Sequence, residues 1–438
     1  MNLDFSKYYD ILKSSHLTKD SGKVTDVTGL LIKGYIPGVS IGSICEIQGS
    51  ATKPLLAEVV GFKDRQVLMM SLSDMRGISM GSKITLAKSV ATVKVSDELL
   101  GRVVDGLAQP LDGKPEMEVI KEVPLYAEVV NPLSRKPIRQ SLDVGVRAIN
   151  AAITVGRGQR VAIMAGSGVG KSVLMGMMAK ETEADVNVIA LIGERGREVR
   201  EFIENELGPK GMKKTVVVCV TSDQSPLLRM RGAYVATAIA EYFAGQGKNV
   251  LLVMDSVTRF AMALREIGLS IGEPPSTRGY TPSVFSTLPK LLERAGNFEN
   301  SGSITGFYTT LVESDDMNDP IGDAVRSIID GHIVLSRELA HKGHFPAIDI
   351  LQSASRVMKA VSSPEHARNA MKLRETLAVY KESEDLINIG AYKMGANPKI
   401  DKAIKSIDAI NDFLKQRTDD HCEMAQCLKQ LMQVTAAL

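Results

Sequence analysis

Residues 160–180 read RVAIMAGSGVGKSVLMGMMAK, and this stretch decides the fold. Its first six residues, Arg160–Ala165, form an apolar run, and the residues after Lys171 have the length and pattern of a helix. The segment AGSGVGKS between them, Ala165–Ser172, is a phosphate-binding loop in its required setting of strand, loop and helix. The usual pattern begins with Gly where this chain has Ala165, a residue small enough to fit.

The loop has the residue types that hold nucleotide phosphates. Its glycines let backbone N–H groups turn inward without a side chain in the way, and the helix N-terminus adds its positive dipole end. Lys171 is expected to reach the β- and γ-phosphates, and the Ser172 hydroxyl to bind Mg²⁺. An incidental Gly-rich turn is the alternative interpretation. The predicted nucleotide-binding residues are Ala165, Gly166, Ser167, Gly168, Val169, Gly170, Lys171 and Ser172.

Two further buried runs end in carboxylates. Asn249–Met254 is followed by Asp255, a position from which a carboxylate holds Mg²⁺, usually through water; a helix N-cap is the alternative role. Val186–Gly193 is followed by Glu194, which beside the γ-phosphate can orient and polarise the attacking water; a surface charge cluster is the alternative here. Because ligands gather at the carboxyl ends of parallel strands, we expect both carboxylates near the loop.

The other runs predict an α/β fold with a doubly wound parallel sheet. Thr215–Thr221 and Ser303–Val312 are apolar throughout, which is typical of strands buried on both faces, and Leu227–Ala244 has helical length. Earlier, short β-rich runs such as Val24–Ile32, separated by glycines, suggest a small barrel or sandwich. The predicted units are an amphipathic helix over 1–20, a β-barrel over 21–92, a nucleotide-binding domain over 93–350 and a charged helical domain over 351–438.

Composition excludes several classes of protein. The 438 residues carry 53 Lys and Arg against 51 Asp and Glu, and this near balance argues against a polybasic nucleic-acid binder. Trp is absent and aromatic residues total 5%, so stacking on single-stranded bases is disfavoured. No apolar run approaches the roughly 18 residues that span a bilayer, the N-terminus lacks a signal-peptide core, and four cysteines make no disulfide framework. We therefore expect a cytosolic protein.

The C-terminal cysteines and Arg356 each have a simple structural explanation. Cys422 and Cys427, next to His421, lack zinc spacing and a fourth ligand, so helix packing is favoured over a metal site. Arg356, in SASRV, lies far along the chain from the loop and on its own residues alone is an ordinary surface arginine.

With these residues in view, the chain resembles the hexameric rotary-type ATPases, namely the catalytic subunit of ATP synthase and its relatives in type III protein export. The resemblance extends from about residue 22 to the C-terminus, and the stretch REIGLSIGEPPSTRGYTPSVF (265–285) is most similar to the flagellum-specific ATPases. The segments that carry it occur in family order: GERGRE (193–198), DSVTRFA (255–261), GEPPSTRGYTPSVFSTLPKLLERAG (272–296), NDPIGDAVRSIIDGHIVLSREL (318–339), FPAIDIL (345–351) and SASRV (353–357).

This resemblance implies a β-barrel, a RecA-like nucleotide domain and a helical domain, with six copies in a ring and ATP at the interfaces. By motif match it implies Lys171 and Ser172 at phosphate and Mg²⁺, Glu194 as the catalytic carboxylate, Asp255 near Mg²⁺, Arg195 and Arg259 near the phosphates, Phe345 against adenine, and Arg356 as an arginine finger for the neighbouring subunit's ATP. For Arg356 the resemblance reverses the interpretation as a surface residue.

The resemblance also implies partners and a place of action. Residues 1–20 would dock a negative regulator of the ATPase. The C-terminal domain would face a stalk-like export protein and the membrane proteins of the export gate, and would engage substrates and chaperones, at the inner face of the cell membrane. The implied function is Mg²⁺-dependent ATP hydrolysis that energises flagellar protein export. The alternatives are a virulence export ATPase, the catalytic subunit of an ion-coupled synthase, an RNA-translocating hexamer and a nucleotide-gated scaffold.

Overall fold

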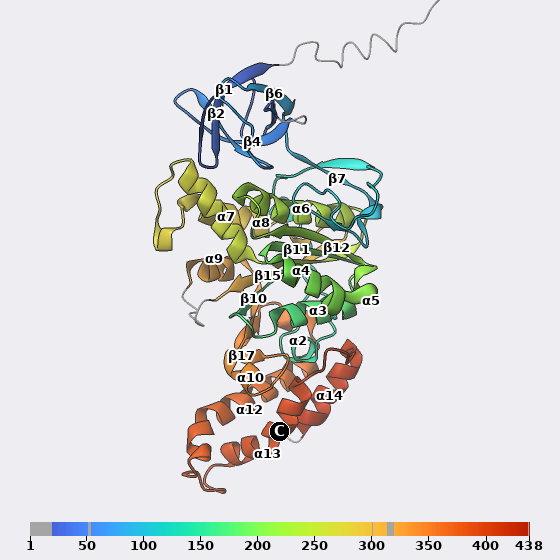
Figure 1. Ribbon diagram of the computed structural model, residues 1–438. Helices are drawn as coiled ribbons and strands as arrows, with labels where there is room; N and C mark the ends of the chain where they lie inside the picture. Colours follow the sequence, from blue (N-terminus) through green and yellow to red (C-terminus); the bar gives the residue numbers. More distant parts are fainter. Residues whose placement is uncertain (1–19, 51–53, 300, 313–318, 437) are drawn as a thin grey trace, which may run out of the picture.

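The computed structural model describes residues 20–50, 54–299, 301–312, 319–436 and 438. A β-barrel, an α/β domain and a helical domain follow one another along the long axis of the molecule (Figure 1). The predicted three-part architecture is therefore confirmed. The helix predicted over 1–20 lies outside the described residues, apart from Asp20.

The N-terminal barrel closes in the strand order β1-β2-β5-β4-β3-β6. Side chains such as Ile32, Ile47 and Val59 fill its core. Gly29, with a φ of +58°, makes a turn that divides the β-rich run Val24–Ile32 into β1 and β2. The barrel strands are β1 (Ser21–Thr28), β2 (Leu31–Tyr35), β3 (Ile44–Ile47), β4 (Leu55–Lys63), β5 (Gln66–Ser71) and β6 (Lys83–Lys88).

The central domain is built on a sheet in the order β17-β16-β10-β15-β13-β11-β12-β8. Neighbours from β16 to β8 are parallel, whereas β17 is antiparallel to β16. The apolar runs predicted as parallel strands are confirmed to within one residue at their ends. The strands are β8 (Val103–Val104), β10 (Arg160–Ala165), β11 (Val186–Glu194), β12 (Thr215–Thr221), β13 (Asn249–Asp255), β15 (Ser303–Leu311), β16 (Gly331–Leu335) and β17 (Ile348–Ser355), with β14 (Gly296–Asn297) beside β15 and β7 (Thr92–Val95) paired with β9 (Lys121–Pro124).

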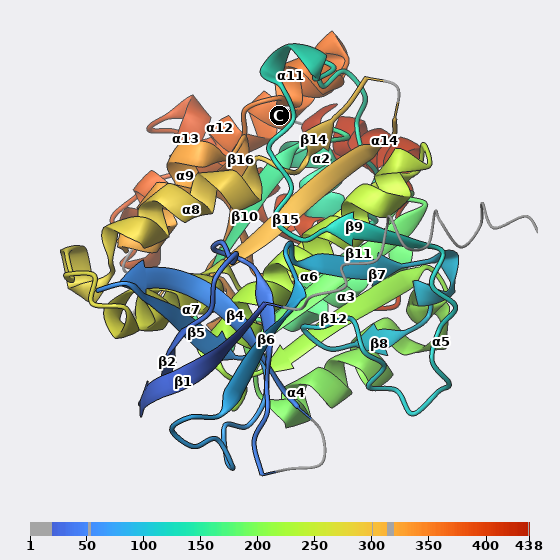
Figure 2. The same cartoon turned by 90° about the horizontal axis from the view of Figure 1, so that it is seen from above.

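Helices cover both faces of this sheet, and the barrel lies over the face that carries α6 and α7 (Figures 1 and 2). On β10, Ala162 and Met164 pack into the core on one face, while Val161 and Ile163 pack into the core on the other. This explains why the strand is apolar without alternation. The helices and short helical turns are α2 (Arg147–Ala152), α3 (Lys171–Glu181), α4 (Gly196–Glu201), α5 (Gly208–Met212), α6 (Pro226–Gly245), α7 (Val257–Ser270), α8 (Pro282–Leu292), α9 (Pro320–Ile328), α10 (Arg337–His341), η1 (Asp97–Leu99), η2 (Pro132–Ser134), η3 (Phe202–Leu207) and η4 (Thr277–Gly279).

The C-terminal helices α11 (Met358–Val361), α12 (Pro364–Asn388), α13 (Pro398–Leu414) and α14 (Met424–Ala436) form the opposite end of the molecule (Figure 1). Leu373, Ile410 and Leu431 belong to the same hydrophobic core as Val161 and Ile163 of β10. The helical domain is therefore packed onto the nucleotide domain. Cys422 and Cys427 are buried in that core, as helix packing predicts. None of the helices in the described part of the chain is both long and apolar enough to cross a membrane.

Candidate functional site

The phosphate-binding loop lies at the carboxyl edge of the sheet, between β10 and α3. Gly168 and Gly170 have φ values of +78° and +89°, which glycine adopts without strain. Gly170 directly precedes α3, so the unpaired N–H groups of the first helical turn border the loop. Ala165 is buried between Leu311 of β15 and Leu335 of β16, a position that suits a small residue.

The order of the strands brings Lys171, Asp255 and Glu194 together. β10, β15, β13 and β11 are parallel neighbours, so their carboxyl ends share one edge. Lys171 Nζ donates to Asp255 Oδ1 over 2.5 Å and lies 3.9 Å from Glu194 Oε1. The two carboxylates expected near the loop thus both approach its lysine.

Thr309 joins this cluster from β15, the strand between β10 and β13. Its Oγ1 donates to Asp255 Oδ1 over 2.6 Å, so one buried carboxylate oxygen accepts from both Thr309 and Lys171. Asp255 is only 2% exposed, and these two donors compensate its charge. Our sequence interpretation missed Thr309, because β15 carries several hydroxyl residues and nothing in the sequence distinguishes this one.

A local irregularity in β11 positions Glu194. The pairing of β11 with β12 changes register between Ile192 and Glu194, and Gly193 has a φ of +72°. A Cβ on Gly193 would lie 3.0 Å from Cβ of Arg259, so glycine allows α7 to approach closely. The carboxylate of Glu194 is therefore directed from an irregular end of β11 rather than from a regular part of the strand.

Burial raises the pKa of Glu194 to about 7. The negative charge of Asp255 contributes to this raised pKa, whereas the ammonium group of Lys171 opposes it. A carboxyl group that titrates near neutral pH can exchange a proton with water under ordinary conditions. Of the groups at this edge, Glu194 is thus suited to act on a water molecule.

Arg195 and Arg259 differ in their surroundings. The side chain of Arg195 is 80% exposed and pairs with Glu198 over 3.0 Å, so it does not join the Lys171 cluster. Arg259 lies on α7 behind Gly193, and its Nη1 donates to Met262 Sδ over 3.7 Å. Of these two arginines, only Arg259 is therefore packed against Gly193, the residue before Glu194 at the end of β11.

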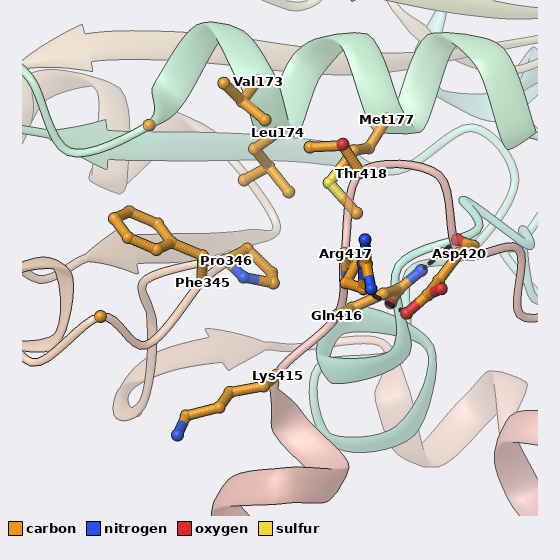
Figure 3. A pocket seen from close by; sticks show the side chains of 12 residues that line it. Val173, Leu174, Met177, Phe345, Pro346, Lys415, Gln416, Arg417, Thr418 and Asp420 are labelled. Atoms are coloured by element: carbon orange, nitrogen blue, oxygen red, sulfur yellow. Dashed lines mark hydrogen bonds between the residues drawn. The ribbon is translucent and has the colours of Figure 1, made fainter.

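A cavity of about 500 Å³ opens beside the phosphate loop (Figure 3). In that view the ring of Phe345 faces Val173 and Leu174 of α3. The other wall is the segment 415–420, whose Gln416 N–H donates to the Phe345 carbonyl oxygen over 2.9 Å. An apolar cavity with an aromatic ring and a polar rim suits a planar base. No feature of the sequence predicts 415–420 here, since this segment simply follows the charged helix α13.

Arg356 lies at the opposite edge of the sheet from the loop. Because β17 is antiparallel, Ser355 pairs with Gly331 at the beginning of β16, which is a neighbour of β10. The six residues of β10 separate this edge from the loop, a span of about 20 Å at roughly 3.3 Å per residue. The exposed side chain of Arg356 therefore faces a different part of the surface from its own phosphate loop.

Known domains match the chain in the order of its three parts. Residues 20–86 match the beta-barrel domain of the ATP synthase alpha/beta family, and residues 145–355 match its nucleotide-binding domain. Residues 362–433 match the T3SS EscN ATPase C-terminal domain. The chain belongs to the ATP synthase alpha/beta family. The resemblance to rotary-type ATPases inferred from the motifs is thus confirmed.

Within this family, similar proteins come from two kinds of export system. The "Flagellum-specific ATP synthase" of Bacillus subtilis (strain 168) is 52% identical over 97% of this chain and 98% of its own length. The "Type 3 secretion system ATPase" of Xanthomonas euvesicatoria is 49% identical over 94% of each. The assembled ATPase EscN of the enteropathogenic E. coli type III secretion system superposes with a TM-score of 0.90 at 48% identity, over 94% of this chain and 100% of that one. EscN with its central stalk EscO superposes with a TM-score of 0.88 at 47% identity, over 94% of this chain and 100% of that one.

The residues at the sheet edge fit the Mg²⁺ that accompanies ATP in this family. The hydroxyl of Ser172 is exposed at the beginning of α3, and the Asp255 carboxylate lies at the mouth of β13. Hydroxyl and carboxylate oxygens are the ligands that Mg²⁺ prefers, and the ion takes its other ligands from water and phosphate.

Proposed function

We propose that this chain is the ATP hydrolase of a flagellar protein export apparatus, which works as a homohexamer and converts ATP and water to ADP and phosphate. One observation carries the proposal. Lys171, Asp255 and Glu194 meet at one edge of the sheet, whereas Arg356 lies at the other edge. Each protomer thus holds most of one ATP site, and its Arg356 is available to complete the ATP site of a neighbouring protomer.

The roles within one protomer follow from these positions. The loop backbone and Lys171 bind the phosphates, and Ser172 and Asp255 would hold Mg²⁺, which offsets negative charge on the transferring phosphoryl group when bound. The Glu194 carboxylate orients the attacking water and accepts its proton. Phe345 covers the adenine from the apolar side of the cavity. Arg259 supports the end of β11 that carries Glu194.

Arg356 acts on the nucleotide of the adjacent protomer. Its exposed guanidinium, far from its own loop, is placed to stabilise the charge of a transferring phosphate across an interface. The assembled state of EscN, a 48% identical relative, supports a ring of copies. A single chain that holds both Glu194 and Arg356 suits a homohexamer better than a synthase whose catalytic subunits alternate with a second chain.

The partners belong to the same proposal. The complex of EscN with its central stalk EscO supports a stalk-like partner for the helical domain. The exposed Ile389 and Met394, at the turn between α12 and α13, offer apolar contact area at that end. We assign binding of the regulator to residues 1–20. We assign contact with the export gate, substrates and chaperones to the C-terminal helical domain, at the inner face of the cell membrane. Virulence export is the second candidate, because the Xanthomonas relative is 49% identical.

The decisive experiment follows phosphate release and molecular mass over a series of protein concentrations. An arginine finger contributes about 10³–10⁵ in rate, so monomer should be nearly inactive and specific activity should rise with the fraction of ring. Added RNA should make no difference. Equal specific activity in dilute monomer and in concentrated ring would overturn the composite site. Restoration of motility in a strain that lacks its flagellar ATPase, without restoration of virulence export, separates the two export functions.

A further inference from the structure

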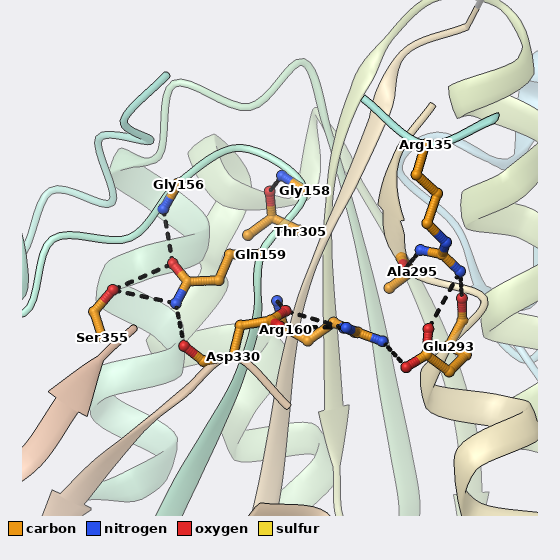
Figure 4. A network of polar contacts seen from close by, with 10 residues as sticks. All are labelled: Arg135, Gly156, Gly158, Gln159, Arg160, Glu293, Ala295, Thr305, Asp330 and Ser355. Carbon is orange, nitrogen blue, oxygen red and sulfur yellow. Dashed lines mark hydrogen bonds and ion pairs between the residues drawn. The ribbon is translucent and has the colours of Figure 1, made fainter. Parts of the chain in front are cut away.

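Gln159 is fully buried at the edge of the sheet that carries Arg356 (Figure 4). Its Nε2 donates to the Asp330 carbonyl oxygen over 3.0 Å and to Ser355 Oγ over 3.2 Å. Its Oε1 accepts from the N–H of Gly156 over 2.9 Å. One side-chain amide thus joins three segments, namely the residues that precede β10 (Gly156), the turn before β16 (Asp330) and the end of β17 (Ser355).

These contacts converge on the backbone of Arg356. The N–H of Arg356 donates over 2.9 Å to the Asp330 carbonyl oxygen, which is the same oxygen that accepts from Gln159. The preceding residue, Ser355, also donates from Oγ to the Thr154 carbonyl oxygen over 2.7 Å. The Ser355 side chain is therefore fixed to the segment that contains Gln159, and the Arg356 N–H is fixed to the Asp330 turn, to which Gln159 also donates.

The Asp330 turn is itself held from its other side. Arg160 donates from Nε to Asp330 Oδ2 over 3.0 Å and from its backbone N to the same oxygen over 3.2 Å. The guanidinium of Arg160 also pairs with Glu293, which lies 3.4 Å from Arg135 (Figure 4). A guanidinium held between two carboxylates has little freedom to move, so Asp330 is a fixed support.

We propose that Gln159 is a positioning residue for Arg356. The inference rests on the proposed role of Arg356 in the neighbouring site. The guanidinium stands at the end of a long flexible side chain, so its reach across an interface depends on where its backbone is held. Misplacement by about 1 Å costs roughly 10²-fold in rate. Gln159 touches the backbone supports of Arg356 and acts only through it.

The test is a double-mutant cycle on the assembled protein. Gln159→Met keeps the size of the side chain and removes its amide, and it is combined with Arg356→Ala. Thr305→Val is the matched control, since its hydroxyl accepts from the N–H of Gly158 beside the network. Turnover and KM for ATP are measured with radiolabelled ATP, and ring assembly and thermal stability are recorded for each variant.

We expect Gln159→Met to lower kcat by roughly 10²-fold with KM unchanged, and to have no further effect in the Arg356→Ala background. The Thr305→Val control should keep its kcat. An unchanged kcat in assembled Gln159→Met, or the same fold loss with and without Arg356, would overturn the inference. If Gln159→Met does not assemble, Ser355→Ala is tested in its place. A loss of kcat that depends on Arg356 is again expected, and an unchanged kcat or a loss independent of Arg356 would again overturn the inference. Full activity of Arg356→Ala instead overturns the proposed finger, so the two failures are distinguishable.

Discussion

Lys171 and Asp255 are joined by a contact of 2.5 Å between Nζ and Oδ1, although Lys171 begins the helix that follows β10, and β10 is not a neighbour of β13, which ends in Asp255. β15 lies between them, and its Thr309 donates to the same oxygen over 2.6 Å. The buried charge of Asp255 is therefore compensated from both sides. Lys171 thus has a structural role in addition to its proposed contact with nucleotide.

Substitution Lys171→Ala should remove both roles. We expect ATP affinity to fall by about 10- to 100-fold, because a hydrogen bond to a charged group contributes about 1.5–3 kcal/mol, and turnover to disappear. Loss of the cation also leaves Asp255 with less compensation, which should lower the free energy of unfolding by up to about 3 kcal/mol. Binding of a fluorescent nucleotide and thermal unfolding measure the two effects. Lys180→Ala, at the far end of α3, is the control, and wild-type affinity in Lys171→Ala would contradict the assignment.

Substitution Glu194→Gln should stop chemistry without stopping binding. The amide keeps the size of the side chain but cannot accept a proton, and general base catalysis contributes about 10²–10⁴-fold. We therefore expect ATP to remain on the ring, unhydrolysed, in a filtration assay. Glu201→Gln, at the exposed end of α4, should hydrolyse ATP as the parent chain does. Brisk phosphate release from Glu194→Gln would mean that another group positions the water.

The raised pKa of Glu194 predicts a pH dependence with a defined sign. A general base must be ionised, so kcat/KM should increase with pH up to about 7 and then level off. Below that pH the slope should approach tenfold per pH unit, as for loss of one proton. Initial rates at low ATP concentration measure this profile. A flat profile through neutral pH would show that no such group titrates in the free enzyme.

The same shift predicts a stability difference between the parent chain and Glu194→Gln. The folded state binds the proton of Glu194 more tightly than the unfolded state, whose pKa is near 4.5. The folded state therefore loses stability as pH rises from about 4.5 to about 7, by up to a few kcal/mol at about 1.4 kcal/mol per pKa unit. Because Gln cannot ionise, the melting temperature of the variant relative to the parent should increase across this window and then stay constant. A difference that does not change with pH would contradict the shift.

The parts of the site that follow one another in sequence could be predicted, whereas those supplied by other elements could not. The loop and its lysine follow β10 directly, and Asp255 and Glu194 end strands whose apolar runs were unbroken. Thr309 lies within a strand rather than at its end, so only the strand order reveals its contact with Asp255. The wall 415–420 comes from the C-terminal domain and reaches the loop only through tertiary packing.

The position of Phe345 beside α3 predicts that its ring contributes to binding of the adenine base and not to binding of the phosphates. Stacking of a base on an aromatic side chain is worth about 1–3 kcal/mol, so Phe345→Ala should raise the Kd for ATP by about 5- to 150-fold. Binding of inorganic triphosphate, which has no base, should not change. Phe345→Tyr keeps the ring and should retain ATP affinity. Equal losses for ATP and triphosphate would place the effect of Phe345 on the phosphate loop instead.

The separation of Arg356 from its own loop predicts complementation between two inactive variants. Arg356→Ala should keep ATP binding but lose about 10³-fold or more in turnover, because its cleft is intact and its neighbour lacks the guanidinium. Glu194→Gln lacks the carboxylate but keeps the guanidinium. In a mixed ring, an Arg356→Ala protomer therefore supplies a cleft with Glu194, and a neighbouring Glu194→Gln protomer supplies Arg356 to it. Phosphate release should therefore recover on mixing the two, and should not recover when the partner is the double variant Glu194→Gln, Arg356→Ala. Equal recovery with both partners, or full activity of Arg356→Ala alone, would show that the guanidinium is not supplied across the interface.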